Sequence, residues 1–456
     1  MIKRNHWLCL LIILLANVSY AQNFSADVRV KGIISDSLNS FWTYSNTNGL
    51  VSPHTRLIGK VSPLYEYEFR NEDSLAIGGS FFYAYNANRE DDWAPNEYFV
   101  TYRKNKLEGI IGAKERERKY LGLSAVGGDI LWSGNARPAP GLWVGTAEPI
   151  RLLRGISLEA ALAHYFLLDD RAVDQAYIHF KKVMVNFEVN PSSTLAMGVH
   201  HYAQWGGVSE TFGEQPSGLS ALGNIFIGQG IEANPNNENP VNALGNHLAS
   251  YRVKFTKRFP ASRLEFYHQS LFEDLPGARL ANFPDGVWGA FLKVDNRSIL
   301  RGILYEYVQT TARSGGDPSL GFDNYFNNTT YKSGWTHYGN TIGMPFITPR
   351  GDGMGISNNV LKAHHFGIMG RYLNFTARFK GSYVQDFGLN ENPDSIDEEH
   401  LYTYVNVRYN SDYYGTFGIS IGYDNNSIQD DAISVGLEYS YSFKTRSGIR
   451  SCDCSY

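Results

Sequence analysis

The stretch Ala432-Ile-Ser-Val-Gly-Leu-Glu-Tyr-Ser-Tyr-Ser-Phe443 decides the fold class of this chain. Side chains alternate between the two faces of a β-strand, so one face of this stretch is apolar and the other is small or polar. The apolar face carries Ile433, Val435, Leu437, Tyr439, Tyr441 and Phe443. About ten alternating residues with aromatics toward one end are typical of a tilted strand that crosses an outer membrane. A strand of a water-soluble sheet can have the same pattern. The rest of the chain therefore has to distinguish a membrane barrel from a soluble sheet.

The N-terminus has the organisation of a secretory signal. Lys3 and Arg4 supply a positive flank, residues 7–16 an apolar core, and Ser19-Tyr20-Ala21 a cleavage site with small residues. The apolar run is too short to span a bilayer as a helix. We therefore expect residues 1–21 to be removed and the mature protein to be exported to the outer membrane.

Composition narrows the class further. Only Cys452 and Cys454 remain after cleavage, so no disulfide framework is expected. Loss of Lys3 and Arg4 changes the formal charge from −4 to −6, which gives no indication of nucleic-acid binding. The mean hydropathy is negative, and no second apolar run of about twenty residues follows, which excludes a helical membrane protein. A transmembrane barrel passes this test because only alternate residues face lipid.

Strand-like segments joined by short polar turns recur along the chain. Long polar loops cover 206–245 and 310–360, and a Gly/Pro-rich run over 127–143 interrupts the pattern. A soluble propeller or stacked sandwich should show internal repeats, and none is found. We predict about eighteen strands, at 24–33, 64–70, 75–85, 97–103, 107–114, 156–166, 175–181, 183–189, 195–204, 249–258, 263–272, 287–294, 299–308, 363–371, 373–385, 401–409, 416–423 and 432–443.

The predicted fold is therefore all-β: a transmembrane, antiparallel, up-and-down β-barrel of about 18 strands with long extracellular loops. Aromatic residues make up 14% of the chain, and its 30 tyrosines suit rings at the membrane–water interfaces. Outer-membrane lipid is thus one expected partner. The expected organisation is a signal peptide at 1–21, an N-terminal strand and loop segment at 22–62, the barrel at 63–443, and a C-terminal tail at 444–456.

Several basic residues on the predicted strands face away from the apolar side. They must point into the lumen, because an Arg or Lys that faces lipid near the midplane costs about 2–4 kcal/mol. Two interpretations stay open for this partly cationic interior: neutralisation by luminal glutamates, or a binding track for acidic sugars. The predicted luminal bases are Arg252, Lys254, Arg258, Arg378 and Lys380.

Five segments occur along the chain in a characteristic order: Trp132-Ser-Gly-Asn-Ala-Arg-Pro-Ala-Pro140, His200-His-Tyr-Ala-Gln-Trp-Gly-Gly207, Glu265-Phe-Tyr-His-Gln-Ser-Leu-Phe-Glu-Asp274, Leu304-Tyr-Glu-Tyr307 and Tyr331-Lys-Ser-Gly-Trp-Thr-His-Tyr-Gly-Asn-Thr-Ile-Gly343. Their order over residues 120–350 resembles the Wzi-type capsule assembly family. The resemblance implies an outer-membrane lectin that holds newly exported capsular polysaccharide or exopolysaccharide at the cell surface, with polysaccharide export machinery as a further partner.

The sequence departs from the family pattern at both ends. The best-known members of the family carry a periplasmic helical bundle near the N-terminus, whereas residues 22–62 have the pattern of strand and loop. Outer-membrane barrels often end on the terminal aromatic residue of the last strand, whereas Phe443 is followed by residues 444–456. Any function tied to the bundle is therefore in doubt.

Metal and catalytic sites are not expected. The pairs His200-His201 and His364-His365 are adjacent on strands, so their side chains point to opposite faces and cannot chelate together. Glu273 and Asp274 are neighbours rather than two carboxylates that flank a glycosidic bond, and no Gly-x-Ser-x-Gly motif is present. We expect no catalytic residue, no metal and no cofactor.

Sugar binding needs flat aromatic rings beside amide, carboxylate or guanidinium groups. Interface girdles and self-packed loops use the same residue types. Two alternatives to a lectin are an outer-membrane porin for oligosaccharides and a barrel-embedded hydrolase or acyltransferase that modifies glycans. The candidate glycan-binding residues are Trp205, Tyr325, Asn327, Asn328, Trp335, His337 and Tyr338.

Overall fold

The computed structural model describes residues 23–69, 73–228, 244–273, 275–295, 297–313, 323–389, 397–427 and 430–445. The expected signal peptide at 1–21 and residues 446–456 of the expected C-terminal tail lie outside these ranges. Within them, no helix combines the length and the apolar character needed to cross a bilayer.

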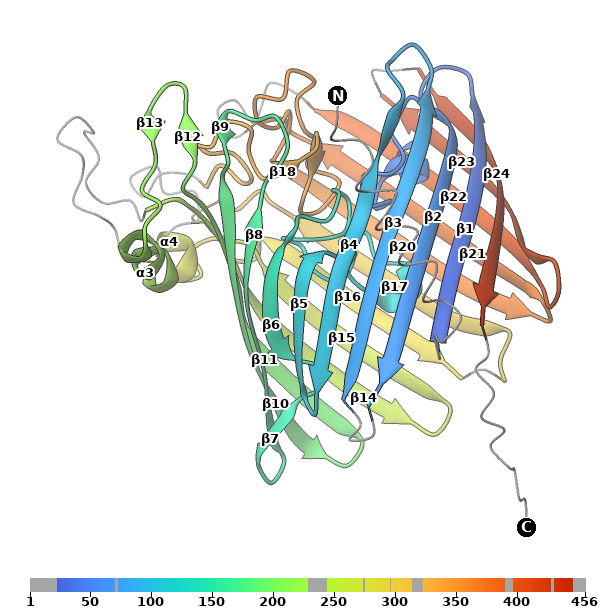
Figure 1. Ribbon diagram of the computed structural model, residues 1–456, viewed down its shortest axis with the longest axis horizontal. Coiled ribbons are helices and arrows are strands. Elements are labelled where there is room, and N and C mark those ends of the chain that lie inside the picture. The colour runs from blue at the N-terminus through green and yellow to red at the C-terminus, as the bar shows by residue number, and fades with distance from the viewer. Residues whose placement is uncertain are drawn as a thin grey trace, which may run out of the picture.

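The described strands form one large antiparallel sheet that closes on itself as a barrel (Figure 1). The first and last strands complete the cylinder, because Val28 pairs with Tyr441 and Ser35 with Ser434. In chain order the wall consists of β1 (Asn23–Ser35), β2 (Thr55–Glu68), β3 (Ser74–Asn86), β4 (Asp92–Lys104), β5 (Leu107–Ala113), β6 (Gly141–Thr146), β7 (Ile150–Leu153), β8 (Ile156–Phe166), β10 (Tyr177–Asn190), β11 (Ser193–Trp205), β14 (Asn246–Phe259), β15 (Ser262–Ser270), β16 (Gly286–Val294), β17 (Leu300–Gln309), β20 (Leu361–Tyr372), β21 (Phe375–Asp386), β22 (Glu398–Ser411), β23 (Gly415–Asn426) and β24 (Ala432–Lys444).

The sheet contains 19 strands in the described ranges, but β6 and β7 pair with successive parts of β8 and act as one interrupted strand. The wall is thus an 18-strand barrel, as predicted. Smaller elements lie outside the wall sequence: α2 (Phe41–Tyr44), η2 (Tyr120–Gly122), β9 (Val173–Asp174), β12 (Val208–Ser209), β13 (Gly213–Glu214), α3 (Leu219–Ile227), α4 (Leu275–Ala278), β18 (Thr336–His337) and β19 (Asn340–Thr341).

The predicted strand number is correct because two errors cancel. The segments 175–181 and 183–189 are one strand, β10, in which Lys181 faces outward and Lys182 inward. The wall also includes β6 and β7, which the Gly/Pro-rich run concealed. Gly145 belongs there because a Cβ at this position would lie 2.7 Å from the Cβ of Ala161 on the paired strand.

The predicted N-terminal segment is also corrected. Residues 22–62 were expected to lie outside the barrel, but β1 pairs with both β2 and β24 over most of its length. The described barrel therefore begins at Asn23 and includes all of β2. β1 alternates as the other wall strands do, with Val28 and Val30 between Asp27, Arg29 and Lys31. The strand predicted at 24–33 is therefore present, and the prediction erred in starting the barrel at residue 63.

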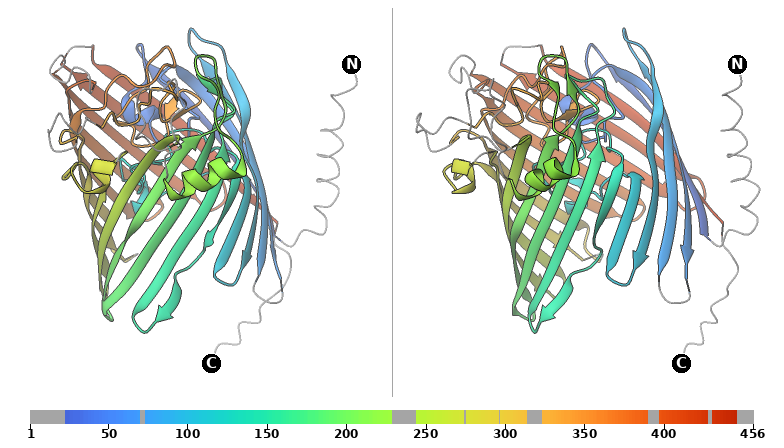
Figure 2. Two further views of the ribbon diagram at one scale, coloured as in Figure 1. Left: turned by 90° about the vertical axis from the view of Figure 1, so that its left-hand side faces the viewer. Right: turned by 60° about the vertical axis from the view of Figure 1, so that its left-hand side comes forward.

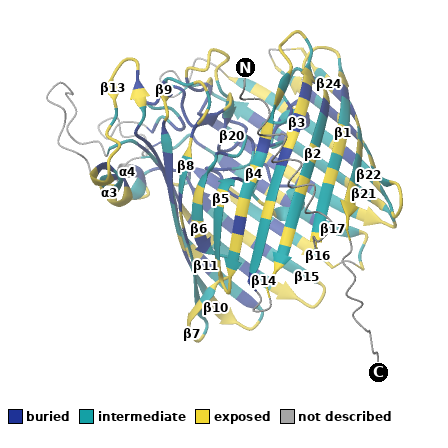
Figure 3. Ribbon diagram, in the orientation of Figure 1, coloured by how far each residue is buried: buried dark blue, intermediate teal, exposed yellow. Residues whose placement is uncertain are grey.

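The alternation in β24 places its residues as predicted. Ile433, Leu437 and Tyr439 are exposed on the outside of the barrel, whereas Ser434 and Gly436 are buried on the inside. Figure 3 shows exposed and less exposed residues alternating along the wall strands. An apolar outer surface of this kind suits a bilayer.

The two ends of the barrel differ in their connections. Short turns, such as those at Asn105 and Gly155, join strands at the end where β1 starts and β24 finishes. Long connections, which include residues 114–140 and the described parts 310–313 and 323–360, gather at the opposite end. Because outer-membrane barrels have short periplasmic turns and long extracellular loops, the long-loop end is extracellular.

Three extracellular connections fold back into the lumen, and we call them the plug: residues 36–54, 114–140 and 323–360. Figure 2 shows the long connections gathered within the upper part of the barrel. Their buried side chains form one apolar core with inward residues of the wall, so the plug fills the extracellular half of the lumen. This core includes Phe41, Trp42, Ile130, Leu131, Trp335, Ile342, Phe346, Phe180, Tyr202 and Val308.

Candidate functional site

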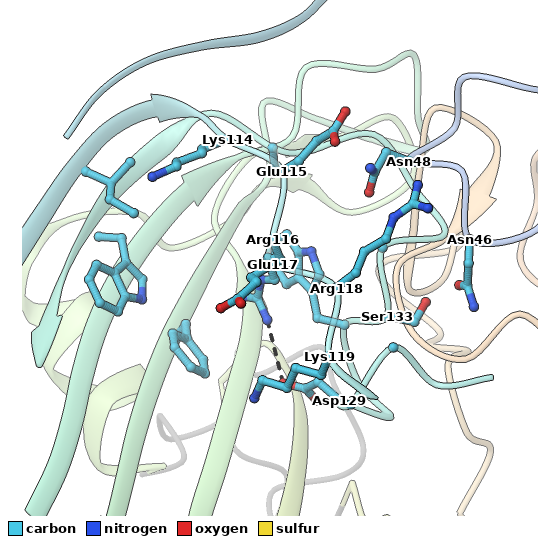
Figure 4. Close-up of a pocket in the computed structure, with 18 of the residues that line it drawn as sticks. Asn46, Asn48, Lys114, Glu115, Arg116, Glu117, Arg118, Lys119, Asp129 and Ser133 are labelled. Atoms are coloured by element: carbon cyan, nitrogen blue, oxygen red, sulfur yellow. Dashed lines mark ion pairs between the residues drawn. The ribbon is translucent and has the colours of Figure 1, made fainter. Parts of the chain in front are cut away.

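A cavity of about 610 Å³ lies in the lumen beside the plug. The plug segment 114–119 runs through it, and inward residues of β5, β6, β8 and β10 line the opposite side (Figure 4). The segment reads Lys-Glu-Arg-Glu-Arg-Lys, so charged groups dominate the cavity surface.

Some of these charges are paired and hold the plug in place. Arg116 lies 3.6 Å from Asp129, donates a hydrogen bond to the hydroxyl of Tyr202 at 3.0 Å and packs 4.2 Å from the ring of Trp132. Glu115 forms an ion pair with Lys60 on β2, with 2.6 Å between the ammonium nitrogen and the carboxylate oxygen. These two residues therefore have structural partners within the protein.

Asp129 is the central anchor of the plug. Its carboxylate pairs with Arg252 on β14 and lies within hydrogen-bond distance, 3.1 Å, of both the His200 ring and the Tyr202 hydroxyl on β11. Burial alone would raise the pKa of Asp129, but Arg252, His200 and Arg116 together hold that pKa well below its usual range. Asp129 therefore stays ionised and ties the plug to two wall strands.

Three cations in the cavity have no such pairing. Within the part of the chain that the structure describes, Arg118, Lys119 and Lys380 make no hydrogen bond or ion pair through their charged groups, and the Lys380 ammonium lies 4.6 Å from the Trp42 ring. Burial and the nearby Arg252 lower the pKa of Lys119 to about 8. Glu108 and Glu117 line the same cavity and offset part of this positive charge, so the cavity presents groups of both signs to a ligand.

The predicted luminal bases have different surroundings. Arg252 is neutralised by Asp129, and Lys254 lies 4.0 Å from Glu265. Arg258 is exposed at the periplasmic end of β14. Lys380 lines the cavity, and Arg378 lies two residues away on the same face of β21. Arg252 and Lys254 are therefore neutralised by luminal carboxylates, whereas Lys380 carries a luminal charge without an ion-pair partner among the described residues.

The large aromatic candidates for sugar stacking are buried. Trp335 is 0% exposed inside the plug and donates a hydrogen bond to the Leu131 carbonyl at 2.7 Å. Tyr325 is 0% exposed and donates to Asp285 at 2.8 Å, and Trp205 is 3% exposed on the outer face of β11, beneath α3. Protein atoms cover these rings, so they stabilise the plug and wall rather than offer a free face to a sugar.

The two asparagine candidates shape turns of the plug. The side-chain oxygen of Asn328 accepts hydrogen bonds from the backbone N–H groups of Thr330 and Tyr331, at 2.9 and 3.1 Å. Asn327 accepts from the backbone N–H of Ile356 at 3.2 Å. Both side-chain oxygens therefore have local backbone partners.

Tyr338 is the candidate with an accessible ring, 42% exposed, next to the buried His337. It occupies the turn between β18 and β19 with a left-handed φ of 48°, and its backbone N–H donates to Asp169 at 3.0 Å. The Arg137 guanidinium lies 4.8 Å from the Tyr338 ring and pairs with Asp92. We call Tyr338, Arg137 and Asp92 the Tyr338 group.

Sequence reasoning missed two members of this group. Arg137 lies within one of the segments that carry the family resemblance, but the segment gives no sign of its contact with Tyr338. Asp92 begins β4, distant from both partners in sequence. Only the closure of the barrel and the path of the plug bring these three residues together.

The paired histidines behave as the strand alternation predicts. His200 faces inward to Asp129, whereas His201 faces outward and lies 2.8 Å from His247. In the described ranges no three His, Cys, Asp or Glu side chains gather as metal ligands would. Glu273 accepts a hydrogen bond from the Phe326 N–H at 2.8 Å, and Asp274 lies outside the described residues.

A closed barrel with an apolar outer surface, short turns at one end and a lumen filled by long loops defines an outer-membrane β-barrel protein. The family described as "Capsule assembly protein Wzi" matches residues 70–348. The chain belongs to this Wzi capsule assembly family.

One solved structure supports this fold. The Escherichia coli Wzi structure, described as an outer membrane protein involved in group 1 capsule assembly and a carbohydrate-binding β-barrel, has a TM-score of 0.59 at 14% identity, covering 95% of this chain and 88% of that one. Pseudomonas aeruginosa OccK11 (OpdR) has a TM-score of 0.47 at 10% identity, covering 93% and 95%. No curated protein sequence shows significant similarity to this chain.

Proposed function

We propose that this protein binds capsular polysaccharide or a related exopolysaccharide at the cell surface and retains it there without altering it. Membership of the Wzi family supports the proposal, and the E. coli relative is described as a carbohydrate-binding barrel. The observation that carries it is the plug, whose apolar core fills the extracellular half of the lumen. A filled mouth offers a binding surface and leaves the porin alternative without support.

The Tyr338 group is our proposed contact with the glycan. An aromatic face suits the apolar face of a pyranose ring, while a guanidinium and a carboxylate can hydrogen-bond its hydroxyls. Tyr338, Arg137 and Asp92 supply these three groups together at the extracellular mouth. Of the candidates taken from the sequence, Tyr338 is therefore the one we propose for stacking.

The test combines binding and retention. Refolded protein is titrated with purified polysaccharide from its own cells, and capsule retention is measured in cells that lack the gene and are complemented with each variant. We expect Tyr338→Ala to weaken binding and to release polysaccharide into the medium, while Tyr338→Phe keeps both. Tyr413→Ala is the matched control, because Tyr413 is 82% exposed at a periplasmic turn.

Wild-type retention on cells that lack the gene would overturn the proposal. Polysaccharide export machinery is a further proposed partner, and cross-linking in intact cells followed by purification of the barrel would test it. Retention of glycan by the purified barrel alone would show that binding does not depend on this partner.

A further inference from the structure

The outer wall carries a polar patch where the barrel faces lipid. His164 on β8, His179 and Lys181 on β10, His201 on β11 and His247 on β14 form this patch, which we call the His–Lys patch. The strand register places His164 beside His179 and Lys181 beside His201, all with outward side chains. The patch lies near the extracellular ends of these strands, where a long basic side chain can reach the headgroup region of the outer leaflet.

Helix α3 crosses the outside of these strands over the patch (Figure 2). Ala221 and Ile225 pack against Trp205 and Ala203 of the wall. The Lys181 ammonium donates to the backbone carbonyl of Phe226 and lies 5.0 Å from its ring.

The opposite side of α3 is apolar and exposed. Leu219 and Ile227 are 89% and 67% exposed. A short helix that lies on the wall with such residues directed outward suits the membrane interface.

Three ring nitrogens of this region have no hydrogen-bond partner in the described residues: Nε2 of His179, Nδ1 of His201 and Nε1 of Trp205. A buried donor without an acceptor costs about 1–3 kcal/mol. The ammonium of Lys181 can also donate to more than one acceptor. Nδ1 of a neutral His201 can only accept, because its Nε2 donates to His247, whose own Nε2 donates to the Leu244 carbonyl. The spare donor capacity for an oxyanion therefore lies in the Lys181 ammonium.

An apolar groove of about 640 Å³ continues from the patch along the outer wall. Ala160 contributes little bulk at its floor, so a long flexible hydrocarbon can enter it. The side chains that line it include Val144, Leu158, Ala160, Leu162, Val183, Val199, Phe226 and Tyr251.

We propose that the His–Lys patch and this groove form a binding site for an anionic lipid of the outer leaflet. One acyl chain occupies the groove, and the lipid phosphate accepts a hydrogen bond from the Lys181 ammonium, which lies at the edge of the groove. The outward position of the site and the match of a cation with an anionic headgroup favour a lipid as the occupant. This site is separate from the glycan contact, which lies at the extracellular mouth.

Native mass spectrometry of the full-length, detergent-solubilised protein tests the proposal with dioleoyl phosphatidic acid as the probe. Dioleoylglycerol, which lacks the phosphate, and inorganic phosphate, which lacks the chains, are the comparison ligands. We expect wild-type protein to retain phosphatidic acid at least about tenfold more strongly than either. Lys181→Gln should remove the preference for the phosphate, and Ala160→Trp should reduce binding of both lipids by filling the groove.

Ala377→Trp is the matched control, because Ala377 is a small, exposed residue on β21, which lies elsewhere in the wall. It should bind phosphatidic acid as the wild type does. Equal retention of dioleoylglycerol, or equal losses in Ala160→Trp and Ala377→Trp, would overturn the proposal. Inorganic phosphate binding as strongly as the lipid would also overturn it. Unchanged circular dichroism of each variant shows that the barrel has folded.

Discussion

At the scale of single residues, Asp129 couples the plug to the wall. It contacts Arg252, His200 and Tyr202, which come from two adjacent strands. Removal of one partner from a buried ion pair is strongly destabilising, because the remaining charge is left without compensation.

We therefore expect Asp129→Asn to lower the free energy of unfolding by about 3–5 kcal/mol. Urea unfolding in detergent, followed by near-ultraviolet circular dichroism, measures the loss. Asp352→Asn is the control, since Asp352 is an exposed residue whose nearest basic partner is the exposed Arg350. An equal effect of both substitutions would contradict the anchoring role.

The same carboxylate predicts a pH dependence. The pKa of Asp129 is lower in the folded protein than the ordinary value of 3.8, so its stabilisation is complete above that value and is lost as the pH falls through the lowered pKa. The difference in urea midpoint between wild type and Asp129→Asn should stay constant from about pH 5 to 8 and shrink below about pH 4. A difference that shrinks on going from neutral to alkaline pH would contradict this sign.

The residue scale also shows where sequence reasoning fails for the site. Trp335 and Tyr338 are close together in one loop, yet the first is buried in the plug core and the second is exposed. Both are large aromatic residues in the same loop. Their burial depends on contacts with Leu131 and Arg137, which lie about two hundred residues earlier in the chain.

At the scale of elements, alternation predicts strands well where outward and inward residues differ clearly, as in β24. Alternation fails in β6 and β7. Gly145 is required there by the close approach of Ala161, and not by whether its position faces the lumen or the lipid. Alternation also cannot show that a loop such as 114–140 turns into the lumen, because that path is set by its contacts with the wall.

The plug predicts the electrical behaviour of the barrel. We expect the wild type to show single-channel conductance near zero in planar bilayers, because an apolar core fills the extracellular half of the lumen. Replacement of residues 323–360 by a short Gly/Ser linker should produce open-channel conductance.

The control for this experiment replaces the β12–β13 hairpin, residues 208–214, which pairs with β9 and contributes no residue to the apolar core of the plug. Its Phe212 ring lies 5.7 Å from the Lys332 ammonium of the plug. Conductance should stay near zero in that variant. An open channel in the wild type would contradict a filled lumen and would restore the porin interpretation.

At the scale of the whole molecule, the two faces of the wall meet different surroundings. The sequence predicted this division, together with the all-β class and the closed barrel of 18 strands. It predicted a strand at 24–33 but placed the start of the wall at residue 63, because the alternation of β1 alone does not show that this strand pairs with β24.

This division predicts opposite tolerance of charge on the two faces. Leu437→Arg places a guanidinium on the outer face and should lower the stability of the barrel by about 2–4 kcal/mol in lipid vesicles. Thr194→Arg points inward beside Glu188 and should change stability little. Urea unfolding of both variants in the same vesicles measures the contrast, and similar losses would argue against a lipid-facing outer surface.

The seam between β1 and β24 also constrains how the molecule is assembled. β1 pairs with β2 on one side and with β24, the last strand of the chain, on the other. The backbone N–H of Thr445 also donates a hydrogen bond to the Phe24 carbonyl across this seam. A polypeptide delivered from its N-terminus cannot complete this ring until synthesis and export have finished. The plug segments must therefore enter the lumen before the barrel has closed. A delay in the final hairpin would leave an open sheet whose plug is exposed to solvent.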